Sequence, residues 1–277
     1  MYDTIEKLGK SLIQHGPYND RIYLMKLDTD DVPDLPARLE AMARDRGYSK
    51  VFAKIPAEYG KGFENQGFRR EALVPGFYNG SHDAAFLGLY LSADRERNIY
   101  EEETRKNLDL AEQKRGRGSS STSTPTPTIT RAAADDVEEM SVVYREVFPS
   151  YPFPIHDPAY LLETMKTHVR YYIVRQEGHI AAISSAEMDI DAGNAEMTDF
   201  ATRPEFRGLG LAVHLLAHME QEMGEVGLPM LYTIARSLSP GMNIVFARRG
   251  YTWAGTLVNN TNISGKIENM NVWYKTR

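Results

Sequence analysis

The sequence contains no cysteine in its 277 residues. This absence excludes disulfide bonds, thiolate metal sites and a cysteine nucleophile. No apolar run approaches the ~20 residues that a membrane-spanning helix needs, so we expect no membrane association. The opening stretch "MYDTIEKLGKSLIQHG" carries acids and lacks an apolar segment, unlike a signal peptide. We therefore expect a cytoplasmic protein.

An excess of basic residues is also missing, because 38 acidic residues outnumber 32 lysines and arginines and give a net charge of −6. Nucleic-acid binders usually present a basic face, so we expect no nucleic-acid partner. The seven histidines show no metal-site spacing. His214 and His218 are four residues apart, but no third ligand accompanies them, and we expect no metal.

One stretch, residues 113–128, is rich in glycine, serine, threonine and proline. Such a segment buries little apolar surface and is typical of a linker. It predicts a smaller N-terminal α/β domain at residues 1–112 and a second domain at residues 129–277. A charged, helix-prone run precedes the linker from residue 101.

The second domain alternates between strand and helix patterns. We expect a helix starting at Asp135 or Asp136, another from about Pro158, and a hairpin turning at Glu177–Gly178. Helical spacing of Leu211, Leu215, Leu216 and Met219 predicts a helix from Gly208 to Gly224 or Gly227. Two strands follow, from Tyr251 and Glu268. This order indicates an α/β fold with a mixed sheet.

The two parts of the chain share a pattern. Phe63, Gly67 and Phe68 have the same spacing as Phe246, Gly250 and Tyr251. The pattern fits either a degenerate internal repeat or two unrelated helix–glycine–strand units. If it is a repeat, the first copy lacks a counterpart of the glycine-rich stretch described next, and we expect it to be structural or to shape the substrate site.

The stretch "TRPEFRGLGLAVHLLAHME", residues 202–220, places Arg207, Gly208, Gly210 and Ala212 at the start of a helix. Free amides at a helix N-terminus bind anions, glycine allows close approach, and arginine adds charge-assisted hydrogen bonds. A Walker loop would need lysine and then serine or threonine after the second glycine, and a Rossmann loop would need a third glycine. The stretch therefore predicts a different kind of pyrophosphate site.

The pattern Arg207-x-x-Gly210-x-Ala212 resembles motif A of the GNAT N-acetyltransferase superfamily. The resemblance implies a GNAT fold over residues 129–277 and acetyl-coenzyme A as cosubstrate. The N-terminal domain would be a degenerate half of that fold if the repeat is genuine. The implied coenzyme contacts are Phe200, Ala201, Thr202, Arg207, Gly208, Leu209, Gly210, Leu211, Ala212 and Asn243. Asn243 is equally compatible with a surface or capping role.

Amine acetylation needs a base, because a protonated amine has no lone pair. Glu196 and Asp199 lie on the strand that leads into the motif. Glu196 matches a strand glutamate that acts as base in some GNAT enzymes, and Asp199 is the alternative base or a cation anchor. Strand alternation predicts that only one of them faces the substrate. Many GNAT enzymes have a tyrosine acid at the position of Phe246, which has no proton to donate.

The whole chain resembles the β-lysine N-acetyltransferase family, in segments such as "AKIPAEYGKGFENQGFRREALVPGFYNG", "ARSLSPGMNIVFARRGY" and "NNTNISGKIENMNVWYK". The resemblance implies acetylation of the ε-amino group of β-lysine, giving the compatible solute Nε-acetyl-β-lysine. Because the last segment is rich in asparagine, we predict Glu268 and Asn269 as substrate contacts. The aromatic stretch 148–154 is either a pocket wall or a packed loop, and Phe77 and Tyr78 are predicted to reach the site.

Two other functions remain compatible with the sequence. One is acetylation of a protein, a peptide or a polyamine. The other is a non-catalytic regulator that binds acetyl-coenzyme A, which the phenylalanine at position 246 favours.

Overall fold

The computed structural model describes residues 2–116 and 126–277, so part of the predicted linker, residues 117–125, lies outside the described residues. In the described residues, strands β1 to β13 form one mixed sheet with the order β1-β2-β3-β4-β6-β5-β12-β13-β11-β10-β9-β8-β7. The strands are β1 (Thr4–Leu8), β2 (Ser11–Gly16), β3 (Arg21–Lys26), β4 (Lys50–Pro56), β5 (Arg69–Tyr78), β6 (His82–Tyr90), β7 (Ile129–Arg131), β8 (Val169–Gln176), β9 (His179–Asp189), β10 (Asn194–Thr202), β11 (Met230–Arg236), β12 (Thr252–Ile263) and β13 (Lys266–Thr276).

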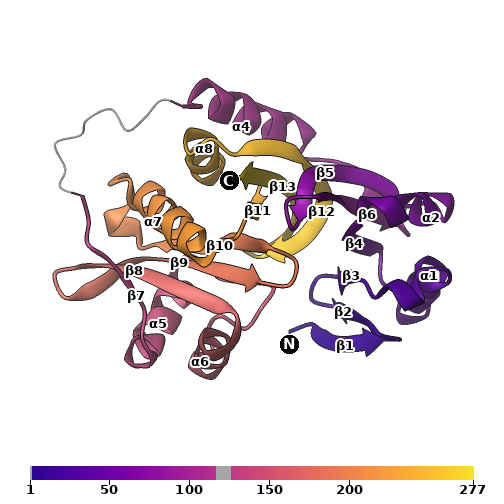
Figure 1. The fold of residues 1–277 in the computed structure, drawn as a ribbon, viewed down its shortest axis with the longest axis horizontal. Helices are drawn as coiled ribbons and strands as arrows, with labels where there is room; N and C mark the ends of the chain where they lie inside the picture. The colour runs from indigo at the N-terminus through magenta and orange to yellow at the C-terminus, as the bar shows by residue number, and fades with distance from the viewer. Residues whose placement is uncertain (1, 117–125) are drawn as a thin grey trace.

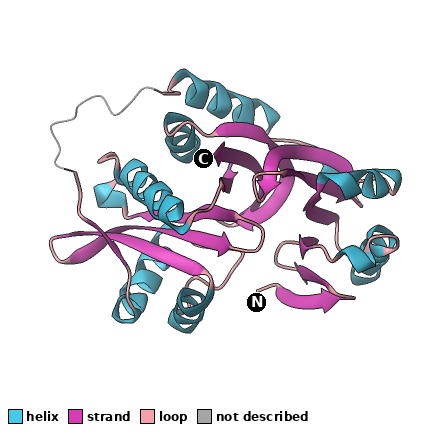
Figure 2. Cartoon of the chain, in the orientation of Figure 1, coloured by secondary structure: helices cyan, strands magenta, loops and turns pink. Residues whose placement is uncertain are grey.

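The helices lie outside the sheet (Figure 2). They are α1 (Leu35–Arg46), α2 (Gly60–Asn65), α3 (Ala93–Glu96), α4 (Glu101–Gln113), α5 (Val137–Val147), α6 (Pro158–Thr167), α7 (Leu211–Val226) and α8 (Pro240–Arg248). The predicted start at Pro158 is confirmed, and the Asp157 side chain accepts a hydrogen bond from the Ala159 amide there. Within the described ranges, no helix is both long and apolar enough to cross a membrane.

The two halves of the sheet have the same topology, as the repeat interpretation predicts. In the C-terminal half, β10 is parallel to β11, which is antiparallel to β13, and β13 is antiparallel to β12. In the N-terminal half, β3, β4, β6 and β5 make the same three pairings in the same order. Helices α1 and α7 fill equivalent connections, and so do α2 and α8.

The halves join through β5 and β12, which pair at Ala72 and Gly255. A buried ion pair supports this junction: Lys50 Nζ lies 2.9 Å from Glu71 Oε2 and donates to the Val258 carbonyl at 2.7 Å. The Glu71 carboxylate in turn accepts the Val258 amide at 2.8 Å. Since Val258 belongs to β12, one buried charge pair of the N-terminal half binds the backbone of the C-terminal half.

Helices cover both faces of the C-terminal half (Figure 1). Helix α7 packs on one face of β8–β10, and α5 and α6 pack on the other. Helix α4 ends the predicted N-terminal domain but lies against α8, where Asn107 donates to the Ser237 carbonyl at 2.9 Å. The predicted boundary at residue 112 thus falls in a helix attached to the other half, and the division into two domains stays a prediction.

Gly255 offers a test of the junction. A Cβ atom at this position would lie 2.0 Å from the Glu71 carbonyl oxygen and 2.8 Å from the Ala72 Cα. We expect Gly255→Ala to lower the free energy of unfolding by ~1–3 kcal/mol, as overpacking does, measured by urea denaturation.

The control is Gly62→Ala in α2, where a Cβ atom meets nothing within 4 Å. Alanine is the better helix former, so this change should leave stability equal or higher. A Gly255→Ala protein as stable as the original would contradict the close approach of β5 and β12.

Candidate active site

The parallel strands β10 and β11 separate along their length. They pair only over residues 194–196 and 230–232, although β10 continues to Thr202 and β11 to Arg236. Beyond Glu196 and Tyr232, each strand keeps only its outer neighbour, β9 or β13. The peptide groups that face the gap have no strand partner, so they are available to a ligand that lies between the strands.

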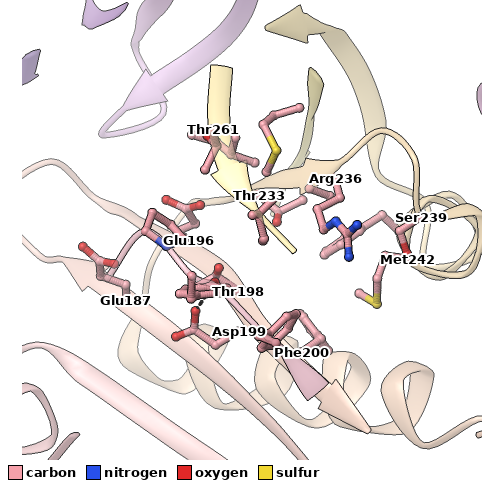
Figure 3. Close-up of a pocket in the computed structure, with 18 of the residues that line it drawn as sticks. Glu187, Glu196, Thr198, Asp199, Phe200, Thr233, Arg236, Ser239, Met242 and Thr261 are labelled. Atoms are coloured by element: carbon pink, nitrogen blue, oxygen red, sulfur yellow. Dashed lines mark hydrogen bonds between the residues drawn. The ribbon is translucent and has the colours of Figure 1, made fainter. Parts of the chain in front are cut away.

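A cavity of about 910 Å³ opens at this separation. Its wall combines β10, β11 and the start of α7 with β3 and β4 of the N-terminal half. Figure 3 shows side chains from β9, β10, β11 and β12 directed toward the same space. The aromatic stretch contributes Phe148, Tyr151 and Phe153 to the lining, and the same residues pack in the hydrophobic core, so the stretch is both a cavity wall and a packed loop.

Two glutamates face each other in the cavity wall. Glu196 on β10 lies directly opposite Glu187 on β9 in the strand register, an unfavourable pairing of like charges. Burial raises the pKa of Glu196 to about 7, and the Glu187 carboxylate adds to the effect. Burial also raises the pKa of Glu187. Glu196 can therefore exchange a proton near neutral pH. These acids form no metal-binding group within the described residues.

Asp199 also lines the cavity, so the prediction that only one of the two acids faces it is wrong. The register of β10 shifts between Thr198 and Ala201, and Asp199 has a φ of +53°. Such a bulge resets the alternation of side chains along a strand. The Tyr151 hydroxyl donates to Asp199 Oδ1 at 2.5 Å, and the Ser185 hydroxyl donates to Oδ2 at 2.6 Å. Burial raises the pKa of Asp199, and these hydrogen bonds oppose the shift.

The glycine-rich stretch forms a loop at the N-terminus of α7. Gly208 and Gly210 have φ values of +84° and +74°, and a Cβ atom on either would meet nothing within 4 Å. No side chain caps α7. Its first amides have no acceptor within the helix, so they are available to an anion, with the helix dipole in support. The loop fits the pyrophosphate that the sequence predicts.

Most of the predicted coenzyme contacts lie together at this end of the cavity. The predicted coenzyme contacts that line the cavity are Phe200, Thr202, Arg207, Gly208, Gly210, Leu211 and Ala212. Ala201 is buried in the core on the face of β10 opposite Phe200, and Leu209, between the two glycines of the loop, is exposed. Arg207 Nε donates to the Thr202 carbonyl at 3.3 Å, which links the loop to the end of β10.

Asn243 lies outside the cavity lining, fully buried behind β11. Its Nδ2 donates to the Arg236 and Ser239 carbonyls at 3.0 and 2.8 Å. Its Oδ1 accepts hydrogen bonds from Asn271 and Trp273. Every polar atom of this side chain thus has a protein partner, and the arrangement ties α8 to the end of β11.

Glu268 and Asn269 also lie behind the wall. Glu268 is fully buried and forms a two-bond ion pair with Arg236, whose side chain lines the cavity. Asn269 accepts the Asn259 amide at 2.8 Å. The asparagine-rich ending has a structural use here, since Asn259 Nδ2 donates to the Arg95 carbonyl and joins β12 to the N-terminal half.

The N-terminal half supplies cavity residues that the sequence analysis missed, namely Arg21, Tyr23, Phe52 and Lys54. They alternate along β3 and β4 with residues such as Ile22 that pack under α1. The alternation in "RIYL", which places Ile22 and Leu24 on the face under α1 and Arg21 and Tyr23 on the other, was the available signal. Phe77 and Tyr78 do not line the cavity. Phe77 instead packs against Tyr232, with ring centroids 4.7 Å apart.

Lys54 stands close to the acids. Its Nζ donates to the Tyr232 hydroxyl at 3.0 Å and lies 5.2 Å from the centre of that ring. Burial disfavours its charge, but Tyr23, Tyr232 and Glu196 outweigh burial and raise the pKa of Lys54. The charged ammonium lowers the pKa of Glu196 against the larger effects of burial and Glu187.

Phe246 lines the cavity and packs edge-on against Phe200, with ring centroids 5.7 Å apart. It carries no proton that it could donate. Tyr251 lies behind it, fully buried and outside the cavity lining.

The separated parallel strands and the uncapped glycine loop at a helix N-terminus have the arrangement that the resemblance to GNAT acetyltransferases predicts. The comparisons with known proteins agree. Residues 137–251 match the acetyltransferase (GNAT) family.

Curated relatives match nearly the whole chain. A beta-lysine N(6)-acetyltransferase of Methanococcus maripaludis is 40% identical, over 99% of this chain and 98% of its own. The N-acetyltransferase YodP of Bacillus subtilis is 32% identical, over 99% of both chains. A beta-lysine N(6)-acetyltransferase of Methanosarcina mazei is 30% identical, over 87% of this chain and 96% of its own. The chain belongs to this family of GNAT acetyltransferases and is an acetyl-coenzyme A-dependent N-acetyltransferase.

The pairing of Glu187 with Glu196 has a measurable consequence. We expect Glu187→Gln to lower the pKa of Glu196 below about 7, because the change removes a like charge and leaves the burial in place. A carbon-13 NMR titration of the glutamate carboxyl groups measures the shift.

The control is Glu163→Gln, which removes a carboxylate from the exposed face of α6. This change should leave the pKa of Glu196 where it is. A Glu196 pKa unmoved or raised by Glu187→Gln would show that the two carboxylates do not interact as described.

Proposed function

We propose that this enzyme acetylates the ε-amino group of β-lysine, 3,6-diaminohexanoate. The observation that carries the proposal is the position of Glu196, with a pKa of about 7, where β10 and β11 separate in a cavity. The relatives named beta-lysine N(6)-acetyltransferase support the choice of substrate. Their similarity spans the N-terminal half, which supplies part of the cavity wall.

The coenzyme would occupy the gap between the strands and the glycine loop. The amides of Leu209, Gly210, Leu211 and Ala212 would hold the pyrophosphate, with Arg207 beside them. The backbone of residues 200–202 would pair with the pantetheine arm. Acetyl-coenzyme A supplies the acetyl group as an activated thioester. Asn243 has no part in this proposal, because its amide is already used within the protein.

Glu196 would act as the general base. A lysine-type ammonium has a pKa of about 10.4, so it must lose a proton before it reacts. The Glu196 carboxylate takes this proton, and the neutral nitrogen forms a bond to the acetyl carbon. The carbon–sulfur bond then breaks, and the nitrogen, now part of the amide, loses its second proton to water. A thiol has a pKa of about 8.5. The sulfur therefore departs as a thiolate and takes its proton from water, since Phe246 has none to give.

The cavity favours a small substrate over a protein or peptide, because walls from both halves surround the acids. Acetylation of one amine converts β-lysine from a net cation to a neutral zwitterion. We propose that this product accumulates in the cytoplasm as a compatible solute. Glu268 and Asn269 have no part in this proposal, since both lie behind the cavity wall.

The deciding experiment follows release of free coenzyme A thiol with β-lysine, α-lysine, ornithine, spermidine and a lysine-rich peptide. The protein has no cysteine, so its own side chains add no thiol signal. The proposal predicts the highest kcat/KM for β-lysine. A preference for spermidine or the peptide would reassign the substrate. Coenzyme binding without turnover of any amine would indicate a regulator.

Glu196→Gln tests the base. We expect kcat to fall by ~10²–10⁴-fold, the usual contribution of a general base. For the original enzyme, log kcat/KM should rise with pH and bend near pH 7, because only the ionised carboxylate accepts a proton. The bend should vanish in Glu196→Gln.

Asp199→Asn separates the two candidate bases. Both Asp199 oxygens already accept hydrogen bonds, so this variant should lose less activity and keep the bend near pH 7. The reverse result, with the bend lost in Asp199→Asn and kept in Glu196→Gln, would make Asp199 the base.

Gly210→Ala tests the pyrophosphate loop. The new methyl group would enter the open space over the first amides of α7. We expect the Kd for acetyl-coenzyme A, measured by calorimetry, to rise roughly tenfold or more through lost charge-assisted hydrogen bonds.

Gly227→Ala is the matched control. Gly227 lies at the opposite end of the same helix and has a φ of +86°. A Cβ atom there would also meet nothing within 4 Å. The backbone strain is therefore similar, but the Kd for the coenzyme should not change. Equal effects of the two substitutions on the Kd would argue against a pyrophosphate at the loop.

A further inference from the structure

Arg21 is a buried cation that the proposed proton transfer does not use. Its side chain is 4% exposed and lines the cavity from β3. Its Nη1 donates to the Asn260 carbonyl and, at 3.1 Å, to Thr261 Oγ1. Both acceptors are neutral. Within residues 2–116 and 126–277, Arg21 has no ion pair, and its Nε has no acceptor.

A buried charge without a counterion is costly, so its position in the wall needs a reason. Burial, with the nearby Arg95 cation, lowers the pKa of Arg21 to about 10, which still leaves it charged at neutral pH. The guanidinium carbon lies 5.4 Å from the Tyr23 ring centre and 5.7 Å from that of Phe52. These rings hold a fork of donors whose geometry suits a carboxylate.

The cavity thus has charges of opposite sign on different walls. The acids belong to β9 and β10 of one half, and Arg21 belongs to β3 of the other. Tyr23, also on β3, is influenced by both walls: burial raises its pKa, the Glu196 carboxylate adds to the effect, and the Arg21 cation opposes it. Lys54 has Glu196 as a negative neighbour, and Lys26 has Asp189 at 3.9 Å, which leaves Arg21 as the cation in this wall without an ion pair among the described residues.

We propose that Arg21 binds the carboxylate of the substrate, so that the N-terminal half selects a diamino acid over a simple diamine. A molecule with an amine at one end and a carboxylate at the other matches the charges of the two walls. The inference rests on the proposed acetylation of β-lysine and assigns a specificity-determining residue for it.

The test measures equilibrium binding rather than turnover. Calorimetry gives the Kd of β-lysine and of its carboxamide for the full-length protein saturated with coenzyme A, in which no acetyl group is present. The carboxamide keeps both amines and loses only the negative charge. We expect the original protein to bind β-lysine roughly 10- to 100-fold more tightly, as for charge-assisted hydrogen bonds. Arg21→Met should remove this preference, and Arg21→Lys should keep part of it.

Arg95→Met is the matched control. Arg95 is also a buried arginine that donates to a carbonyl of β12, that of Asn259, at 2.7 Å. It has Asp20 as its carboxylate partner at 3.3 Å and does not line the cavity. Its loss should lower stability and leave the ratio of the two Kd values unchanged.

Several results would overturn the proposal. The proposal fails if the original protein binds β-lysine and its carboxamide with equal affinity, or if it binds neither of them. A folded Arg21→Met protein that keeps the preference, or an Arg95→Met protein that loses it, would overturn the proposal as well. Carboxylate-dependent binding through Arg21 without acetyl transfer would contradict the proposed function alone.

Discussion

The separation of β10 from β11 is the constraint on which the rest of the site depends. Two parallel strands that stayed paired would satisfy each other's peptide groups and leave no space between them. Here the pairing stops at Glu196 and Tyr232. The register of β10 against β9 then shifts at the bulge around Asp199, and the glycine loop follows the end of β10 at the start of α7. One departure from regular pairing therefore creates the cavity, frees the backbone and places the acids at its inner end.

The second requirement is a wall opposite the acids, and the N-terminal half supplies it. The N-terminal half has the same strand order as the C-terminal half but lacks the glycine loop. The start of α1 is flanked by Asp28, Asp30, Asp31 and Asp34, which would repel a pyrophosphate. Buried polar groups, among them Lys50, Glu71 and Arg95, fasten this half to β12. The half without the glycine loop thus serves as a wall of the cavity that opens in the other half.

Opposing electrostatic effects act on the three buried acids Glu187, Glu196 and Asp199. Placing Glu187 opposite Glu196 in a buried sheet is unfavourable when both are ionised. Burial, with this repulsion added, raises the Glu196 pKa to about 7, so its carboxyl group can exchange a proton near neutral pH. Lys54 moderates the repulsion, and hydrogen bonds from Tyr151 and Ser185 keep Asp199 in place. The arrangement lowers stability to some degree and leaves a group that titrates near neutral pH in the cavity wall.

Local pattern alone determined much of this protein. Helical spacing from Leu211, glycines at positions 208 and 210, and the hairpin turn at Glu177–Gly178 are short-range features, so the α/β class, the element order and the anion loop could be predicted. Only the tertiary structure decided which side chains meet. The bulge at Asp199 interrupts the alternation of side chains along β10, and Glu268 forms its ion pair with Arg236 behind the cavity wall. Arg21 and Lys54 line the same cavity as Glu187 and Glu196, although they are more than 130 residues away from these acids in the sequence. Such contacts arise from the register of distant strands and from the balance of buried charges, which no local spacing encodes.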